Sequence, residues 1–412
     1  MGKVLFKNCS VLDTISGQLL YDYHVLIEDS KILELSDKPI KTKDPLSINV
    51  DGRVLMPGLI DIHVHPTITT MNIASTLSKP VTLVMHEARK ILEGILLRGF
   101  TTIRDTAGSD FGLAMAVEKG LIMGPRIFYC GRALSQVGGH GDIRPLKDNP
   151  HLCSGSIETD FLFHVVDGVD GVRKAAREEL RKGAHAIKIM ASGGVASPTD
   201  PISNTQYSIE EMRAVVEEAE SWHKYVSAHA YTADAITRAV RSGVRTIEHA
   251  NLIDTSAAEL MAERQAYVVP TLVAYSSIAK YGNSFNFPEV SMRKVREILD
   301  SGLSSIEICK DAGVQMGFGT DLLGELHQYQ SEEFAIRSEV LSPLEIIKSA
   351  TLVNAEIINM SGQLGVIAPG AVADILVVDG DPTKDLTLLQ NQGEHLDVIM
   401  KDGEFVVNRL SV

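Results

Sequence analysis

The chain has 412 residues, of which 44% are hydrophobic and 22% are charged, and its formal net charge is −14. This length and composition are typical of a globular protein with one large α/β core and an accessory domain. The acidic balance, without a dense Lys/Arg patch, argues against nucleic acid and anionic membrane surfaces as partners. No apolar run reaches the roughly 18 residues of a membrane span, so we expect no membrane insertion.

The four cysteines are far apart, at Cys9, Cys130, Cys153 and Cys309, and no two of them form a CxxC pair. This spacing predicts neither a zinc knuckle nor a disulfide scaffold. The N-terminal segment lacks the long apolar core of a signal peptide, and Phe6 does not fit the myristoylation pattern. We therefore expect a reduced, cytoplasmic protein.

Both ends of the chain alternate between apolar and polar residues over short stretches. Residues 1–56 contain KVLFKN, YDYHVLIED, KILELS and INVDGRVLM, and residues 360–412 contain VADILVVDGDP and VIMKDGEFVVN. Alternation bounded by turn residues such as Asp-Gly predicts antiparallel strands. We expect the two ends to assemble into one small β-sandwich domain.

Residues 57–359 alternate between short apolar strands and helical periodicity. The expected strands are GLIDIHVH, FTTIRD, RIFYCG, HAIKIMAS, YVSAHAY, VRTIEHA, AYVVPT and VQMGFGTD, and the expected helices include GVRKAAREELRKG and SIEEMRAVVEEAESWHK. Eight strands, most of them followed by a helix, predict an α/β fold of the (β/α)8 TIM barrel type. Active-site groups of such barrels lie at the C-terminal ends of the strands.

The first expected strand, in PGLIDIHVHP, carries two histidines. His63 and His65 are two residues apart, so both side chains point to the same face of the strand. Two imidazole nitrogens on one face suit zinc or a similar borderline metal ion. The pair alone does not exclude a half-exposed strand with polar residues on its wet face.

Four further polar residues lie at other expected strands. Lys188 lies in the fourth strand, while His229, His249 and Asp321 end the fifth, sixth and eighth. Each alone has an ordinary structural explanation, and Asp321 could cap the following helix. A barrel brings the ends of these strands together at one rim, so the whole set predicts a metal centre.

These motifs resemble the amidohydrolase superfamily over nearly the whole chain. The similar segments are PGLIDIHVH, Lys188 in AIKIMASGG, His229 in SAHAY, His249 in IEHA, Asp321 in FGTD, and the C-terminal PGAVADILVVDGDP. Superfamily members with a lysine in the fourth strand are binuclear hydrolases. The resemblance therefore implies two divalent metal ions, expected to be zinc, and an N6-carboxylated Lys188 that bridges them as a carbamate.

The resemblance also implies how the metal ligands divide. They are His63, His65 and Asp321 for the first ion, His229 and His249 for the second, and Lys188 with a hydroxide between them. Burial beside Ile187 and Ile189 favours the neutral lysine amine, the form that can attack carbon dioxide. The implied reaction is attack by the bridging hydroxide, with Asp321 moving the proton from the water to the leaving nitrogen.

Three more residues resemble those of the prolidase-like and metallo-carboxypeptidase subgroup, which includes relatives that split the amide of ochratoxin. They are His140 in QVGGHGD, Tyr231 in HAY and His327 in DLLGELHQYQSEEF. The resemblance implies that His140 polarises the scissile carbonyl, that Tyr231 contacts the substrate carboxylate, and that His327 lines the pocket. A loop position without a role for His140 and ordinary packing for Tyr231 stay open as alternatives, and Arg144 is an unsupported candidate for the carboxylate.

The implied substrate is a small molecule, either an Xaa-Pro dipeptide or an N-acyl amino acid, whose amide bond to the C-terminal amino acid is hydrolysed. An ochratoxin A amide hydrolase is the main alternative.

An imidazolonepropionase-like ring hydrolase, a lactonase or phosphotriesterase, and a deaminase fit less well. Several mononuclear deaminases have a glutamate where this chain has Thr232, and they lack the bridging lysine. A non-catalytic scaffold would have lost ligands that this chain retains. Barrels of this kind often pair, so we expect a homo-oligomer.

Overall fold

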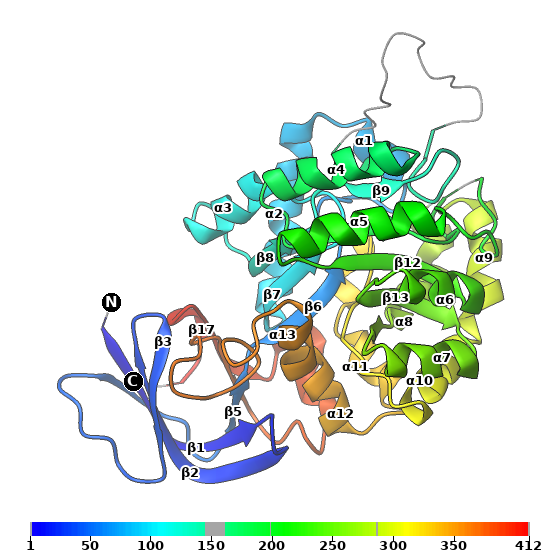
Figure 1. Ribbon diagram of the computed structural model, residues 1–412. Helices are drawn as coiled ribbons and strands as arrows, with labels where there is room; N and C mark the ends of the chain where they lie inside the picture. Colours follow the sequence, from blue (N-terminus) through cyan, green and yellow to red (C-terminus); the bar gives the residue numbers. More distant parts are fainter. Residues whose placement is uncertain (1, 145–160, 198, 286, 411–412) are drawn as a thin grey trace.

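The computed structural model describes residues 2–144, 161–197, 199–285 and 287–410. Figure 1 shows a barrel of strands surrounded by helices, with a smaller β-rich body beside it that contains strands from both ends of the chain. The expected TIM barrel with a β domain built from the two chain ends is thereby confirmed. The domain boundaries after residues 56 and 359 stay a prediction.

The β domain is one eight-stranded sheet. Its strands are β1 (Lys3–Asp13), β2 (Gln18–Glu28), β3 (Lys31–Ser36), β4 (Leu46–Asn49), β5 (Val54–Pro57), β15 (Ile375–Val378), β16 (Leu396–Lys401) and β17 (Glu404–Asn408). They follow the order β17-β16-β15-β5-β1-β2-β3, with β4 paired to β1. β15 pairs antiparallel with β5, with Ile375 opposite Pro57, and this pair joins the two chain ends. Phe6, Ile27 and Val398 are fully buried, because the period-two pattern turns one face of the sheet inward.

The barrel wall is built from parallel strands in two sheets. The strands are β6 (Leu59–Val64), β7 (Phe100–Asp105), β8 (Arg126–Tyr129), β9 (Ala133–Ser135), β10 (Phe163–Val165), β11 (Ile187–Met190), β12 (Val226–Thr232), β13 (Thr246–Leu252) and β14 (Tyr267–Val269). One sheet has the order β6-β7-β8 and the other β10-β9-β11-β12-β13-β14. A hydrogen bond of 2.8 Å from His185 N to Tyr129 O connects β8 to the start of β11.

The expected eighth strand, VQMGFGTD, closes the barrel without forming a regular strand. It makes a single parallel bridge between Met316 and Val268, and Phe318 O accepts a hydrogen bond from Ile62 N at 3.0 Å. The side chain of Asn354 takes up both main-chain groups of Phe318, at 3.0 and 2.9 Å. A side chain thus replaces part of the strand ladder that the apolar pattern predicted.

Helices cover the outside of the barrel. They are α1 (Ile73–Leu77), α2 (Val81–Leu97), α3 (Phe111–Glu118), α4 (Val169–Arg181), α5 (Ile209–Ser221), α6 (Ala233–Arg241), α7 (Thr255–Glu263), α8 (Leu272–Tyr281), α9 (Glu289–Leu299), α10 (Gly302–Asp311), α11 (Glu332–Arg337), α12 (Pro343–Lys348) and α13 (Asn354–Ile357). Short 3-10 and π turns are η1 (Gly282–Phe285), η2 (Gly324–Tyr329), η3 (Ser349–Val353), η4 (Leu386–Leu389) and η5 (Asn391–Gly393). Two of these helices begin with a capping box, formed by Ser208 and Glu211 at α5 and by Ser342 and Glu345 at α12. Each pair stabilises the helix start because its side chains accept hydrogen bonds from main-chain N–H groups there.

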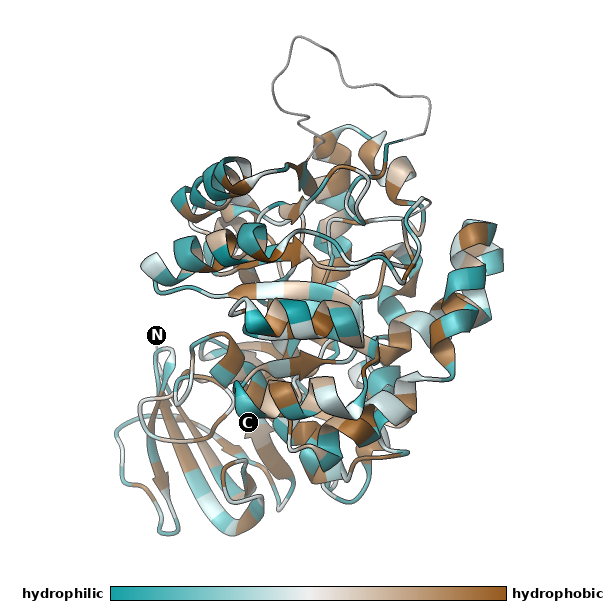
Figure 2. Cartoon of the chain, turned by 45° about the vertical axis from the view of Figure 1, so that its right-hand side comes forward, coloured by the Kyte–Doolittle hydropathy of each residue, from teal (hydrophilic) through white to brown (hydrophobic). Residues whose placement is uncertain are grey.

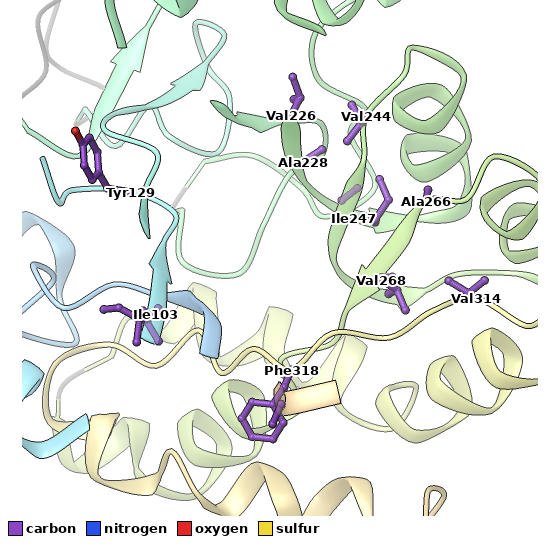
Figure 3. Close-up of a cluster of buried hydrophobic side chains, with 14 of the residues drawn as sticks. Ile103, Tyr129, Val226, Ala228, Val244, Ile247, Ala266, Val268, Val314 and Phe318 are labelled. Carbon is purple, nitrogen blue, oxygen red and sulfur yellow. The ribbon is translucent and has the colours of Figure 1, made fainter. Parts of the chain in front are cut away.

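Apolar side chains from many strands fill the core. Figure 3 shows Ile103 of β7, Ala228 of β12, Ile247 of β13 and Val268 of β14 in one cluster that also includes Phe318. The outer helices carry both hydrophobic and hydrophilic bands, as Figure 2 shows for their ribbons. Helices α4, α5 and α6, for example, bury apolar residues along one face, which packs on the barrel.

Among the helices formed by the described residues, none has the length and apolar composition of a membrane span. Cys9, Cys130 and Cys309 are buried free thiols, and Cys153 lies outside the described residues. A cytoplasmic location and a homo-oligomer stay predictions.

Candidate metal centre

Five of the six predicted ligands come from four neighbouring or facing strands of the barrel. His63 lies in β6 and His65 directly after it, while Lys188, His229 and His249 lie in β11, β12 and β13. All five are at least nine-tenths buried. Asp321, the sixth, follows the segment that closes the barrel, and its side chain is 21% exposed. Parallel strands bring these side chains to one rim although their positions in the sequence are far apart.

The carboxylate of Asp321 lies among the imidazoles. Its Oδ1 is 3.4 Å from Nε2 of His63 and 3.2 Å from Nε2 of His65, and its Oδ2 is 3.8 Å from Nδ1 of His249. His63, His249 and Asp321 each offer a ligand atom, and these three atoms lie within 4.8 Å of one another. Three donors this close can coordinate a single ion.

The rings of the four strand histidines form a continuous row. The ring centroids are 5.4 Å apart for His63 and His65, 4.9 Å for His63 and His249, and 4.6 Å for His229 and His249. Burial is the largest effect that lowers the pKa of His229 and His249 well below the ordinary range, and nearby Lys188 lowers both further. Neutral imidazole is the form that binds metal ions, so these environments favour coordination.

Lys188 is buried beneath this row without a polar partner. Its side chain is 1% exposed, and among the described residues no atom accepts a hydrogen bond from its Nζ. Ile187 and Ile189, its neighbours in β11, are fully buried, and burial lowers the pKa of Lys188 to about 8. A buried polar group without a partner costs about 1–3 kcal/mol, so this amine fits a position whose partner is a ligand or a covalent modification.

Together these residues fit the binding of a divalent cation. Imidazoles and one carboxylate are ligands that zinc and similar ions prefer, and an unpartnered amine is the precursor that a bridging carbamate requires. Burial opposes ionisation of Asp321, but His63 and His65 beside it hold its pKa well below the ordinary value. The carboxylate is therefore ionised at neutral pH, which is the state that binds a cation.

The main chain is strained where the ligands enter the site. His249, Ala250 and Asp321 have φ values of +77°, +56° and +52°, a region that residues other than glycine rarely adopt. The main-chain N–H of Asp321 donates to His63 O at 2.7 Å and holds this turn in place. Strain of this kind persists at functional sites because the surrounding structure imposes it.

Gly319 allows the closing segment to approach β6. A Cβ atom at this position would lie 2.7 Å from Cβ of His63 and 2.6 Å from Cγ1 of Val269, closer than real Cβ contacts. Asp321 can reach the histidines only because this residue has no side chain.

The predicted substrate-binding residues occupy different places. The ring of His140 stacks on that of His229, with centroids 4.2 Å apart and planes 16° apart, and Tyr231 lies edge-on to His229 at 4.9 Å. His327 is buried and its Nε2 lies 3.3 Å from the main-chain oxygen of His65. His140 and Tyr231 thus border the ligand row, whereas His327 contacts the main chain behind it.

Arg144 is already engaged with a neighbour. Its Nε and Nη2 lie 2.6 and 2.5 Å from the carboxylate of Asp142. This bidentate pair occupies the face of the guanidinium that a substrate carboxylate would use.

The loop after Lys188 is held firmly to the site. Gly193 O lies 3.1 Å from Nε2 of His229, and Gly194 N donates to Oδ2 of Asp200 at 3.2 Å. A Cβ at Gly194 would lie only 2.2 Å from Cε1 of His140, so glycine is required there. The N–H of Gly194 is therefore used within the loop.

Sequence reasoning did not identify several polar residues around the ligands. Glu248 accepts a hydrogen bond from Nδ1 of His63, and Arg104 donates one to Glu248. The hydroxyl of Thr271 lies 2.8 Å from Nδ1 of His249. The hydroxyl of Tyr275 lies 2.9 Å from that of Tyr231. A charged residue inside an otherwise apolar strand, as in FTTIRD and TIEHA, was the signal that could have identified the first two.

Comparisons with known proteins agree on one family. The model described as "Amidohydrolase family" matches residues 54–406. The ochratoxinase of Aspergillus niger is 32% identical over 349 residues, which are 82% of this chain and 72% of the relative. A solved amidohydrolase is 52% identical with a TM-score of 0.96, covering 98% of this chain and 99% of its own. A prolidase solved with N-methylphosphonate-L-proline is 51% identical with a TM-score of 0.96, covering 98% of this chain and 100% of its own.

Proposed function

The chain belongs to the amidohydrolase family, and from that premise we propose that it is a binuclear metal-dependent hydrolase of Xaa-Pro dipeptides. The bond cleaved is the amide bond to the C-terminal amino acid. The observation that carries the metal centre is the convergence of Asp321 with three histidines above the unpartnered amine of Lys188. The substrate class is supported by the likeness to a prolidase solved with a proline phosphonate, which covers 98% of this chain and 100% of that one.

We assign the ligands as the resemblance to the amidohydrolase superfamily implies. His63, His65 and Asp321 would hold one divalent cation, His229 and His249 the other, and N6-carboxylated Lys188 would be a ligand shared by both. His249 also lies within reach of His63 and Asp321, so the two sets of ligands adjoin. Bound divalent cations supply Lewis acidity toward the amide carbonyl and lower the pKa of a water molecule to about 7.

Asp321 is the proton carrier in this proposal. Its carboxylate is ionised at neutral pH and is the most exposed group of the ligand set, so a water molecule and a substrate can both reach it. It would accept the proton of the attacking water and deliver it to the departing nitrogen, as a general base and then a general acid.

His140 would donate a hydrogen bond to the scissile carbonyl. Its pKa is lowered, mainly by burial, so the ring is neutral near pH 7. Nδ1 lies 2.8 Å from the hydroxyl of Ser197. The single proton of that hydroxyl can go to Gly194 O, at 3.1 Å, or to Nδ1 of His140, and Gly194 O also accepts from Nζ of Lys294 at 2.8 Å. The proposed role requires that the hydroxyl donates to Nδ1, because the proton of the neutral ring is then on Nε2 and this N–H can face the substrate.

Tyr231 and Tyr275 would bind the substrate carboxylate. Their hydroxyls are 2.9 Å apart and buried beside His249, and burial raises the pKa of both tyrosines above the ordinary range. Both hydroxyls therefore stay protonated. In a hydroxyl pair one group donates to the other, which leaves one O–H for a carboxylate oxygen.

The test combines metal analysis with a substrate panel. The purified protein is loaded with zinc in bicarbonate buffer, its metal content is measured by mass spectrometry, and kcat/KM is determined for Xaa-Pro dipeptides, matched Xaa-Ala dipeptides, N-acetyl amino acids and lactones. We expect about two ions per chain and the highest kcat/KM on Xaa-Pro. Turnover restricted to lactones would refute the substrate class while leaving the metal centre in place.

One observation favours a second candidate. The ochratoxinase of Aspergillus niger matches 82% of this chain, so an N-acyl amide of an aromatic amino acid is the alternative substrate. Including ochratoxin A and N-acetyl-phenylalanine in the panel separates the two. A kcat/KM on ochratoxin A above that on every Xaa-Pro dipeptide would select the second candidate.

A further inference from the structure

A buried carboxylate lies directly behind the predicted metal ligand His63. Glu248 is fully buried in β13, and its Oε2 accepts a hydrogen bond from Nδ1 of His63 at 2.7 Å. Its Oε1 accepts from the hydroxyls of Ser227 and Thr246, at 2.6 and 2.7 Å. These contacts hold the carboxylate from both sides, so its orientation is determined by the barrel interior.

Arg104 supplies the countercharge. It is also fully buried, and its Nη2 donates to Oε1 of Glu248 at 2.7 Å. Its Nε donates to Ile62 O at 2.7 Å, and its Nη1 lies 3.2 Å from the hydroxyl of Tyr225. A lone buried carboxylate would be very unfavourable, so the guanidinium is what allows a charged acceptor at this depth.

The hydrogen bond determines which nitrogen of His63 carries the proton. A carboxylate accepts only, so Nδ1 of His63 must be the donor and must be protonated. In the neutral ring Nε2 is then unprotonated, and this atom lies 3.4 Å from Asp321 at the site. A ligand histidine whose second nitrogen donates to a carboxylate is both oriented and more basic.

The other strand histidines lack such a partner. Nδ1 of His65 lies 3.3 Å from the main-chain oxygen of Ala107, and Nδ1 of His249 lies 2.8 Å from the hydroxyl of Thr271. These partners are neutral groups, and Oδ1 of Asp105, which lies 3.8 Å from Nδ1 of His65, is beyond hydrogen-bond distance. Within the described residues, His63 is the one ligand imidazole that has a carboxylate at hydrogen-bond distance from the nitrogen facing away from the site.

We propose that Glu248 is a positioning residue for the first metal ion, which holds His63 in its Nδ1–H tautomer with Nε2 facing the site, and that Arg104 fixes Glu248. The inference rests on the proposed metal centre but not on the substrate. It assigns a role to a buried ion pair that makes no contact with the reacting atoms.

Glu248→Gln tests this role, because it keeps the shape of the side chain and removes its charge. The matched control is Glu333→Gln, since Glu333 is equally buried and pairs with Arg337 at 2.6 Å but touches none of the ligands. Apo protein is titrated with zinc against a chromophoric chelator, without any substrate. We expect Glu248→Gln to weaken the tighter zinc site by roughly 10- to 100-fold, the usual effect of losing such a partner, and Glu333→Gln to leave it within twofold.

A zinc affinity of Glu248→Gln within twofold of wild type, with both proteins folded by circular dichroism, would overturn the proposal. So would equal losses in Glu248→Gln and Glu333→Gln, since that result indicates a general effect of breaking a buried ion pair. Wild-type protein that binds no zinc would overturn it as well. Wild-type protein that binds zinc but hydrolyses no dipeptide would refute the proposed function and leave this inference intact.

A second measurement uses wild-type protein, so it tests the proposal even if the Glu248→Gln variant does not fold. In wild-type apo protein labelled with 15N-histidine, proton–nitrogen correlation spectra show which ring nitrogen of His63 carries the proton. We expect an Nδ1–H signal that persists because the group is buried. A neutral His63 protonated on Nε2 would contradict the proposal.

Discussion

Oδ1 of Asp321 lies 3.2 Å from Nε2 of His65, although the two residues come from opposite ends of the barrel sequence. The same oxygen lies 3.4 Å from Nε2 of His63. The barrel is closed by the segment that carries Asp321, so closure of the fold and assembly of the candidate site are one event.

Asp321→Asn should lower kcat by about 10²- to 10⁴-fold, the usual contribution of a general acid–base group. The amide keeps the shape of the side chain but cannot accept a proton. The measurement is kcat on the best Xaa-Pro dipeptide, with bound metal determined on the same sample. Asp110→Asn, at the exposed N-cap of α3, is the control and should keep wild-type activity. Full turnover of metal-loaded Asp321→Asn would show that another group carries the proton.

Lys188→Met should change stability and activity in opposite directions. The substitution removes a buried amine without a partner from an apolar strand, so we expect the apo protein to gain about 1–3 kcal/mol of unfolding free energy. The bridging group is lost at the same time, so metal content and kcat should fall. Denaturant unfolding with chelator present and metal analysis without it measure the two effects. A less stable apo variant would indicate that Lys188 has a structural partner.

Lys294→Met should lower kcat through the loop that supports His140. Nζ of Lys294, in α9, donates to the main-chain oxygens of Gly194, Ser197 and Asp200, at 2.8, 2.7 and 2.6 Å. Without these three hydrogen bonds the loop can move away from His140. We expect a loss of roughly 10-fold in kcat, since misplacement of a catalytic group has effects of that order or larger.

A double-mutant cycle with His140→Ala separates this effect from a general loss of stability. If Lys294 acts through His140, Lys294→Met costs little further activity once His140 is absent. Losses in kcat that multiply independently would show that the two residues act separately.

His185 should make the protein less stable as the pH falls from about 6.5 to 4. Burial and nearby Lys224 lower the pKa of His185 to about 4, and its Nδ1 accepts a hydrogen bond from Tyr129 N at 3.2 Å. The unfolded chain binds this proton near pH 6.5 and the folded chain does not, so stability is complete above that pH and decreases below it. The loss is up to about 3 kcal/mol by pH 4.

His185→Asn is the matching variant, because an amide oxygen can accept from Tyr129 N but does not titrate. Denaturant unfolding at pH 7 and pH 4.5 should show a smaller pH dependence for the variant than for wild type. Identical pH dependence in both proteins would assign the acid sensitivity to other groups.

The amino-acid sequence by itself determined the architecture. Alternation of apolar strands with helical periodicity is a local property, so it predicts the TIM barrel and the β domain from both chain ends, and both are confirmed. The two-residue spacing of His63 and His65 placed both rings on one side of a strand. The rule that barrel sites lie at strand ends selected the other ligand candidates, and the structure brings their side chains together.

Only the tertiary structure decided what surrounds those ligands. The closing segment is not a regular strand because the side chain of Asn354 replaces part of its ladder. Glu248 reaches His63, and Lys294 reaches the loop after Lys188, across distances in sequence that no local period encodes. Whether a buried charge has a partner depends on which side chains the folded barrel places within hydrogen-bond reach, and that is a property of three-dimensional packing alone.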